Sequence, residues 1–115
     1  MQQPLHATLG YRRIATCTPR VQPANVAGNV GHIIDLAAQA EQLGADIIVM
    51  PELCITGYTC ADLFLQQSLL DSAVQGLERI RAWSVDHTPV LVVGLPLQVA
   101  GRLVNAAAVV HGGSI

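Results

Sequence analysis

The sequence predicts an α/β fold, in which short apolar strands alternate with amphipathic helices. Runs such as 46–50 (DIIVM) and 90–95 (VLVVGL) are apolar throughout, as strands of a buried parallel sheet are. Between them, apolar residues recur at three- and four-residue steps, which is the period of an amphipathic helix. Strand, helix and strand follow one another along the chain, an order typical of a βαβ unit. The 115 residues suffice for one small domain, 1–115, and not for two.

The first strand is expected at 13–18 (RIATCT), where β-branched and small side chains predict a buried strand that the following proline ends. Asn25 comes next as a candidate helix N-cap. An amphipathic helix pattern follows directly, with polar side chains, Asn29 among them, interleaved between the apolar ones. Gly44 can adopt the left-handed conformation in which many helices end, so the helix is expected to stop there.

The segment 46–50 comes next, and its length and β-branched content predict a strand buried on both faces. A second helix is expected at about 65–84, with an apolar face formed by Leu70, Ala73, Leu77 and Ile80. A proline then opens the strand 90–95.

The last elements indicate a hairpin, in which the strands 97–99 and 103–110 are joined by a turn at Ala100-Gly101. The segment 111–113 (HGG) is a further turn signal. Only two residues follow it, so we expect the chain to be the incomplete first portion of a larger domain. The composition supports this expectation, because 51% apolar and 12% charged residues are unusual for a small free-standing domain with a large relative surface.

Charge and cysteine content exclude several classes of function. The net charge is −2, and the six basic residues are scattered arginines, so the basic stripe of a nucleic-acid-binding protein is missing. The apolar stretches are too short to span a membrane. The three cysteines have no metal-type spacing and the four histidines lie far apart, so we predict no metal or cofactor site in these residues. A reducing, cytoplasmic location is expected.

Glu52 is the candidate catalytic residue. It lies directly after the strand 46–50, at the carboxyl end of a buried parallel strand, where open α/β sheets bind ligands. A carboxylate held partly out of water at such a position can accept a proton near neutral pH. Position alone leaves a structural role open, in which Glu52 caps a turn or pairs with an arginine.

The segment 49–64 (VMPELCITGYTCADLF) resembles the glutamate motif of the nitrilase superfamily, through 51–53 (PEL) and 56–58 (TGY). The resemblance extends along the whole chain, because further segments stand in family order: RIATCTP, the helix with Asn29, VLVVGLPL and RLVNAAAVVHGG. It implies that these residues form the first portion of a nitrilase-type α-β-β-α sandwich. It also implies cleavage of carbon–nitrogen bonds by a Glu-Lys-Cys triad.

Within the superfamily, two features resemble the glutaminase domain of bacterial glutamine-dependent NAD⁺ synthetases. One is 57–58 (GY) followed by 62–63 (DL) and a helix, and the other is 10–13 (GYRR) before the first strand. Residues 1–115 would then be the N-terminal portion of a carbon–nitrogen hydrolase (glutamine amidotransferase) domain.

The resemblance assigns Glu52 the role of general base. In the family this glutamate takes the proton of a catalytic cysteine, whose thiolate attacks the side-chain amide of glutamine, while a lysine supplies positive charge near the oxyanion. The ammonia serves an ATP- and Mg²⁺-using synthetase domain that amidates nicotinic acid adenine dinucleotide. The expected partners are therefore glutamine, the remainder of the same chain with its synthetase domain, and further copies of the protein in a homo-oligomer.

The chain departs from the family pattern because it contains no lysine and none of its cysteines stands at the nucleophile position. Glu52 is then the one triad member present, and these 115 residues alone are expected to be inactive. The substrate-binding residues cannot be assigned from the resemblance. Tyr58 either lines the amide pocket or anchors its loop through the hydroxyl group, and Asp62 is a candidate N-cap of the second helix.

Two other interpretations remain open at this stage. The parent protein is either a synthetase or a stand-alone amidase or carbamoylase of the same superfamily, which its total length would distinguish. Alternatively, the chain is a non-catalytic, truncated product that binds a partner through an exposed sheet edge. A monodisperse peak in size-exclusion chromatography would support that third interpretation.

Overall fold

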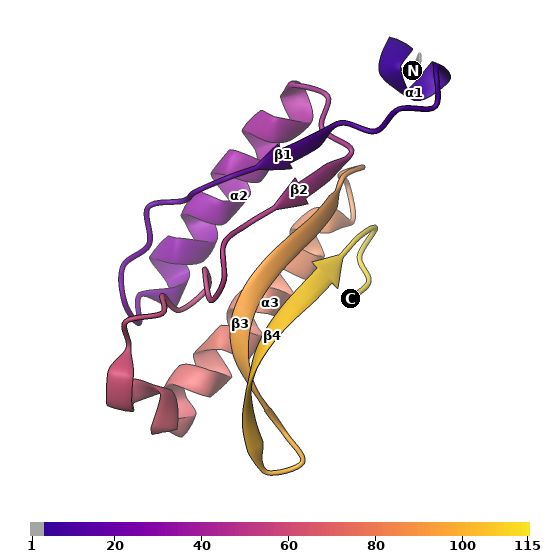
Figure 1. Ribbon diagram of the computed structural model, residues 1–115. Helices are drawn as coiled ribbons and strands as arrows, with labels where there is room; N and C mark the ends of the chain where they lie inside the picture. Colours follow the sequence, from indigo (N-terminus) through magenta and orange to yellow (C-terminus); the bar gives the residue numbers. More distant parts are fainter. Residues whose placement is uncertain (1–3) are drawn as a thin grey trace.

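The fold is an α/β arrangement in which two long helices cover one face of a four-stranded sheet (Figure 1). The structure is a computed structural model that describes residues 4–115. The elements follow in chain order: α1 (Leu5–Thr8), β1 (Ile14–Thr16), α2 (Val26–Gln42), β2 (Ile47–Val49), the 3₁₀ helix η1 (Ala61–Leu65), α3 (Gln67–Ser84), β3 (Val90–Val99) and β4 (Arg102–Val110).

The sheet has the strand order β1-β2-β3-β4. β1, β2 and β3 run parallel, and β4 is antiparallel to β3. The predicted βαβ unit is therefore confirmed, since α2 connects β1 to β2. The structure adds a second unit, in which α3 connects β2 to β3. Figure 1 shows both helices behind the same face of the sheet, with the β3–β4 hairpin extending beyond the shorter strands.

The core forms between this sheet face and the helices. Ile48, Leu91 and Leu95 point from the sheet into it, and Ile33 and Ile80 point from the helices; each of these five side chains is fully buried. The predicted apolar face of α3 is confirmed, because Leu70, Ala73, Leu77 and Ile80 are all buried.

The opposite face, which we call the open face, is not covered by any element within residues 4–115. It carries the register row Thr16, Val49, Val92 and Val109, and Val109 is 54% exposed. The predictions that 13–18 is a buried strand and that 46–50 is buried on both faces are therefore wrong. Ile14 on the edge strand is 61% exposed, and in β2 only Ile48 is fully buried. A continuous apolar run predicts a strand, but it does not show whether one face or both faces of that strand are covered within these residues.

Both predicted ends of α2 are confirmed. The Asn25 side chain accepts a hydrogen bond from the Gly28 N–H at 3.2 Å. At the other end Gly44 has a φ of +83°, and the Ala45 N–H donates to the Ala40 carbonyl at 3.0 Å. This left-handed residue closes the last turn and directs the chain into β2.

The N-terminus of α3 differs from the prediction. The helix begins at Gln67, and the preceding segment 61–65 is the 3₁₀ helix η1. Asp62 lies inside the first turn of η1, and Cys60 occupies the cap position, although its side chain makes no capping hydrogen bond to this helix. Asp62 is therefore not an N-cap, because the chain makes an extra turn before α3 begins.

The predicted hairpin is present, but its first strand is longer than expected. Residues 90–95 and 97–99 belong to one continuous strand that includes Pro96. Pairing with β2 ends at Val92, so Pro96 has only β4 as a neighbouring strand and its missing N–H is tolerated. The turn at Ala100-Gly101 is confirmed, and the 111–113 turn is closed by reciprocal hydrogen bonds between His111 and Ser114.

Two histidines on the helix side of the molecule have structural partners. His87 shares a hydrogen bond with Glu41 at 2.6 Å, and its ring stacks on Trp83, so this tryptophan packs at the end of α3. His32 contacts the Arg20 carbonyl at 2.7 Å.

Asp46 attaches the N-terminal segment to the sheet. Its carboxylate accepts hydrogen bonds from the Arg13 N–H at 2.8 Å and from His6 at 2.9 Å. The Arg13 backbone N–H is the largest cause that lowers the pKa of Asp46 from its ordinary value of 3.8, and His6 adds to the effect. A carboxylate whose pKa is lower in the folded state stabilises the fold while it is ionised.

We expect Asp46→Asn to unfold at a lower temperature than wild type near pH 7. Ionised Asp46 stabilises the fold above its ordinary pKa, and this contribution disappears as the pH falls through the lower, folded-state pKa. The difference in melting temperature should therefore shrink below about pH 4 and vanish under more acidic conditions. Thermal unfolding at a series of pH values measures it, with Asp35→Asn as the exposed control. A difference that is independent of pH would contradict this explanation.

Candidate active site

The site is built on the loop that follows β2. The Met50 N–H donates to the Val92 carbonyl at 2.9 Å, so pairing with β3 continues one residue past the strand. Leu53 then adopts a positive φ of 51°, and the Gly57 N–H closes the turn on the Leu53 carbonyl at 2.7 Å. Residues 51–57 therefore form a tight turn, the glutamate loop, at the carboxyl end of β2.

Gly94 of β3 lets the glutamate loop approach the sheet. A Cβ atom at this position would lie 2.4 Å from the Leu53 nitrogen and 3.1 Å from the Glu52 carbonyl carbon. The Gly94 carbonyl accepts the Ile55 N–H at 3.1 Å, and the Gly94 N–H donates to the Cys54 sulfur at 3.4 Å. The loop is thus fixed directly on the backbone of β3, where no larger residue fits.

Glu52 lies at the carboxyl end of β2, as the sequence predicts, but its side chain is exposed within the described chain. The expected partial desolvation is therefore not present. Among residues 4–115, Glu52 takes part in no ion pair, so the pairing with an arginine that its position left open is not observed. Its carboxylate instead accepts a hydrogen bond from the Asn105 side chain of β4. Its assignment as general base stays a prediction.

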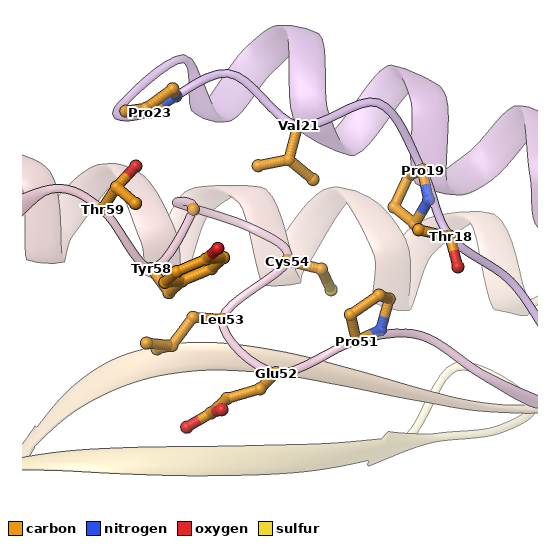
Figure 2. Close-up of a pocket in the computed structure, with 11 residues that line it drawn as sticks. Thr18, Pro19, Val21, Pro23, Pro51, Glu52, Leu53, Cys54, Tyr58 and Thr59 are labelled. Carbon is orange, nitrogen blue, oxygen red and sulfur yellow. The ribbon is translucent and has the colours of Figure 1, made fainter.

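A cavity of about 360 Å³ lies beside the glutamate loop (Figure 2). Figure 2 shows its two walls: the segment 18–23 on one side and the loop residues on the other, with Glu52 directed toward the β3–β4 hairpin. The lining residues are Thr18, Pro19, Val21, Pro23, Pro51, Glu52, Leu53, Cys54, Gly57, Tyr58 and Thr59.

Tyr58 belongs to this cavity wall. Its side chain is 74% exposed, and its hydroxyl group makes no hydrogen bond to any described residue. Of the two roles considered for Tyr58, the structure favours lining the cavity over anchoring the loop.

The three cysteines occupy structural positions. Cys54 and Cys60 are buried, and Cys17 is half-buried at the end of β1. Burial raises the pKa of the Cys54 and Cys17 thiols, which disfavours the nucleophilic thiolate. The Cys60 sulfur lies 3.2 Å from the Thr56 carbonyl oxygen and stabilises the loop.

Asn29 of α2 connects the two walls of the cavity, the segment 18–23 and the glutamate loop, through hydrogen bonds. Its amide donates hydrogen bonds to the Gln22 carbonyl at 2.8 Å and to the Ile55 carbonyl at 3.1 Å, and its oxygen accepts the Gln22 N–H at 2.8 Å. The sequence placed Asn29 among the polar, solvent-facing residues of α2, but it is 1% exposed. Its position is determined by the two loops that pack over the helix, which a helical period does not reveal.

We expect Asn29→Leu to lower the free energy of unfolding by about 2–4 kcal/mol, because the buried Asn29 side chain loses three hydrogen bonds to the backbone and their partners stay unsatisfied. Denaturant unfolding measures the change, and Gln39→Leu on the exposed side of α2 is the matched control. If both variants unfold like wild type, Asn29 does not connect the two cavity walls energetically.

Neither a metal site nor a membrane span was found in the described part of the chain. No group of three or more His, Cys, Asp and Glu side chains within residues 4–115 is arranged to hold a metal ion. None of the helices described here is both long and apolar enough to cross a bilayer.

The sequence patterns did not identify Asn105 or Gly94. A signal for Asn105 does exist in the sequence. When the hairpin register is extended from the turn at Ala100-Gly101, Asn105 pairs with Pro96, on the open face. No local signal indicated that the glutamate loop would cross β3 at Gly94.

Comparison with known proteins places these features in context. A family model described as carbon-nitrogen hydrolase matches residues 13–115. The chain is 39% identical over 106 residues to a glutamine-dependent NAD(+) synthetase of Mycobacterium tuberculosis, covering 92% of the chain and 16% of the relative. It is 37% identical over 106 residues to the enzyme of the same name from Xylella fastidiosa, covering 91% and 19%. The chain thus spans less than a fifth of the length of these relatives.

Solved structures agree with the fold. The crystal structure of a glutamine-dependent NAD(+) synthetase from Cytophaga hutchinsonii superposes with a TM-score of 0.83 at 33% identity, covering 90% of the chain and 17% of that protein. An amidase from Nesterenkonia sp. superposes with a TM-score of 0.73 at 26% identity, covering 90% and 40%.

Proposed function

Because the chain belongs to the carbon-nitrogen hydrolase family of the nitrilase superfamily, we propose that it forms part of a glutaminase domain and supplies the general base Glu52. In this proposal the domain hydrolyses the side-chain amide of glutamine. The ammonia serves the ATP-dependent amidation of nicotinic acid adenine dinucleotide to NAD⁺ in a longer protein.

The observation that carries the proposal is the position of Glu52. Its loop follows a central parallel strand and is fixed on the backbone of Gly94, and its carboxylate reaches the open face of the sheet. Relatives that cover more than nine-tenths of the chain are named glutamine-dependent NAD(+) synthetases. Their names supply the substrate and the product, and the geometry supplies a place for a base.

The proposed chemistry needs two groups that these 115 residues do not contain in suitable form. A cysteine thiol transfers its proton to the Glu52 carboxylate, and the thiolate attacks the amide carbon of glutamine. A lysine stabilises the negative charge on the carbonyl oxygen. Ammonia leaves with the proton that Glu52 returns, and water then releases glutamate from the thioester. The chain has no lysine, and its buried cysteines are held in structural positions, so both groups must come from other residues of the full protein.

The same proposal extends to cofactors, partners and location. ATP and Mg²⁺ would act in a separate synthetase domain, outside these residues. Glutamine is the small-molecule partner of the domain, and the full protein would act as a homo-oligomer in the cytoplasm.

The test is an assay of the full-length protein with nicotinic acid adenine dinucleotide, ATP and Mg²⁺. NAD⁺ should form with either glutamine or ammonium as the nitrogen source, and glutamate should appear in step with NAD⁺ when glutamine is used. If ammonium supports NAD⁺ formation but glutamine does not, the glutaminase assignment is wrong.

A second candidate function is that of a stand-alone amidase. The superposition on the Nesterenkonia amidase, over 90% of the chain, favours it. Release of ammonia from simple aliphatic amides without any NAD⁺ formation, by a full-length protein of about amidase size, would select this alternative.

A further inference from the structure

We propose that Asn105 is the positioning residue for the Glu52 carboxylate. The inference rests on the proposed function, in which Glu52 is the general base. Asn105 lies on β4, and its side-chain Nδ2 donates a hydrogen bond to Glu52 Oε1. The two residues come from separate elements and are 53 positions apart in the chain, so the contact is not a local turn.

The surroundings make this hydrogen bond specific. Glu52 and Asn105 line a shallow groove of about 310 Å³ on the open face, whose remaining lining residues are Val49, Met50, Pro51, Val92, Val93, Gly94, Ala106 and Ala107. Those eight residues present no polar side-chain group other than the methionine sulfur. Within the groove, Asn105 is thus the one side chain that can donate a hydrogen bond to Glu52.

The hairpin register explains why the donor stands at this point. Asn105 pairs with Pro96, and the neighbouring same-face pair is Gly94 with Ala107. Gly94 brings the glutamate loop onto the sheet, and the small Ala107 leaves space beside it. A side chain two positions along β4 can therefore extend across to the carboxylate.

An asparagine amide suits this task chemically. It is neutral at every relevant pH, so it cannot take the proton that the base must carry. Its hydrogen bond occupies Oε1 and holds the carboxylate plane, which leaves Oε2 available to accept a proton from the nucleophile.

Three variants of the full-length protein test the proposal. Asn105→Ala removes the donor and the shape, Asn105→Asp keeps the shape but removes the donor, and Gln98→Ala removes an exposed amide from the same face of the hairpin. We expect kcat for glutamine hydrolysis to fall about ten- to hundredfold in Asn105→Ala, with KM changed less than about twofold, and to fall at least as far in Asn105→Asp. NAD⁺ formation from ammonium and the activity of Gln98→Ala should match wild type.

The outcomes separate the inference from the proposed function. If Asn105→Asp keeps wild-type kcat while Asn105→Ala does not, Asn105 only fills space and the positioning role is wrong. If both variants hydrolyse glutamine like wild type, the inference also fails, although the glutaminase function stands. If wild type itself does not hydrolyse glutamine, the proposed function fails first, and a structure of the full-length protein would then show whether the amide still meets the carboxylate.

Discussion

Glu52→Gln should abolish glutamine hydrolysis in the full-length protein, with a loss of about 10²- to 10⁴-fold in kcat. The substitution preserves the length and shape of the side chain, and the new amide oxygen can still accept the hydrogen bond of Asn105. What disappears is the group that takes the proton of the nucleophile. The fold should be unaffected because Glu52 is exposed and makes no ion pair within the described chain.

The measurement compares two nitrogen sources in the same protein. Glutamine-dependent NAD⁺ formation should be lost, while ammonium-dependent formation continues at the wild-type rate, because ammonium does not require the glutaminase step. Asp35→Asn, on the exposed side of α2 and without an ion pair in the described chain, is the matched control and should behave like wild type in both assays. Equal activity of Glu52→Gln and wild type with glutamine would exclude Glu52 as the base.

Gly94→Ala should be the most damaging single-methyl change in the chain. The added Cβ would lie 2.4 Å from the Leu53 nitrogen, a backbone atom that cannot rotate away, so the glutamate loop must move off β3. We expect a loss of about 1–3 kcal/mol in the free energy of unfolding. A displacement of the base by about 1 Å is expected to reduce glutamine hydrolysis about 10²-fold.

Gly31→Ala supplies the matched control for this change. It adds the same methyl group inside α2, where nothing lies within 4 Å of the added Cβ atom. Alanine is the better helix former, so this variant should be as stable as wild type or more stable by up to about 1 kcal/mol. Denaturant unfolding and the glutaminase assay distinguish the two glycines. If Gly94→Ala retains both stability and activity, the close approach at Gly94 does not determine the position of Glu52.

The parts of the fold that depend on neighbouring residues could be predicted from the sequence. Asn25 and Gly44 cap α2 as expected, because capping involves only residues within one helical turn. The buried face of α3 follows from the helical period, and the turn at Ala100-Gly101 follows from Gly101, which tolerates the positive φ of 76° that it adopts. Each of these features depends only on residues that lie close together in the sequence.

The features that could not be predicted depend on contacts between distant segments. Asn29 is polar, but two loops pack over this part of α2, so its side chain is buried and hydrogen-bonds to both of them. Ile14 belongs to an apolar strand, but nothing in its neighbourhood indicates that the strand lies at an edge. Within the candidate site, the family motif identifies Glu52, whereas the contact of Asn105 with Glu52 also depends on where the glutamate loop crosses β3.

The central place of β2 in the sheet has a consequence for the order of folding. The β3–β4 hairpin closes through a two-residue turn, so we expect it to form early. β2 must find β1 and β3 across intervening helices, and such long-range parallel pairings close slowly. Glu52 and Asn105 meet only after β2 has docked on the hairpin. We therefore expect the contact between Glu52 and Asn105 to form in one of the last folding steps, so that a partly folded chain would hold Glu52 without its hydrogen-bond donor.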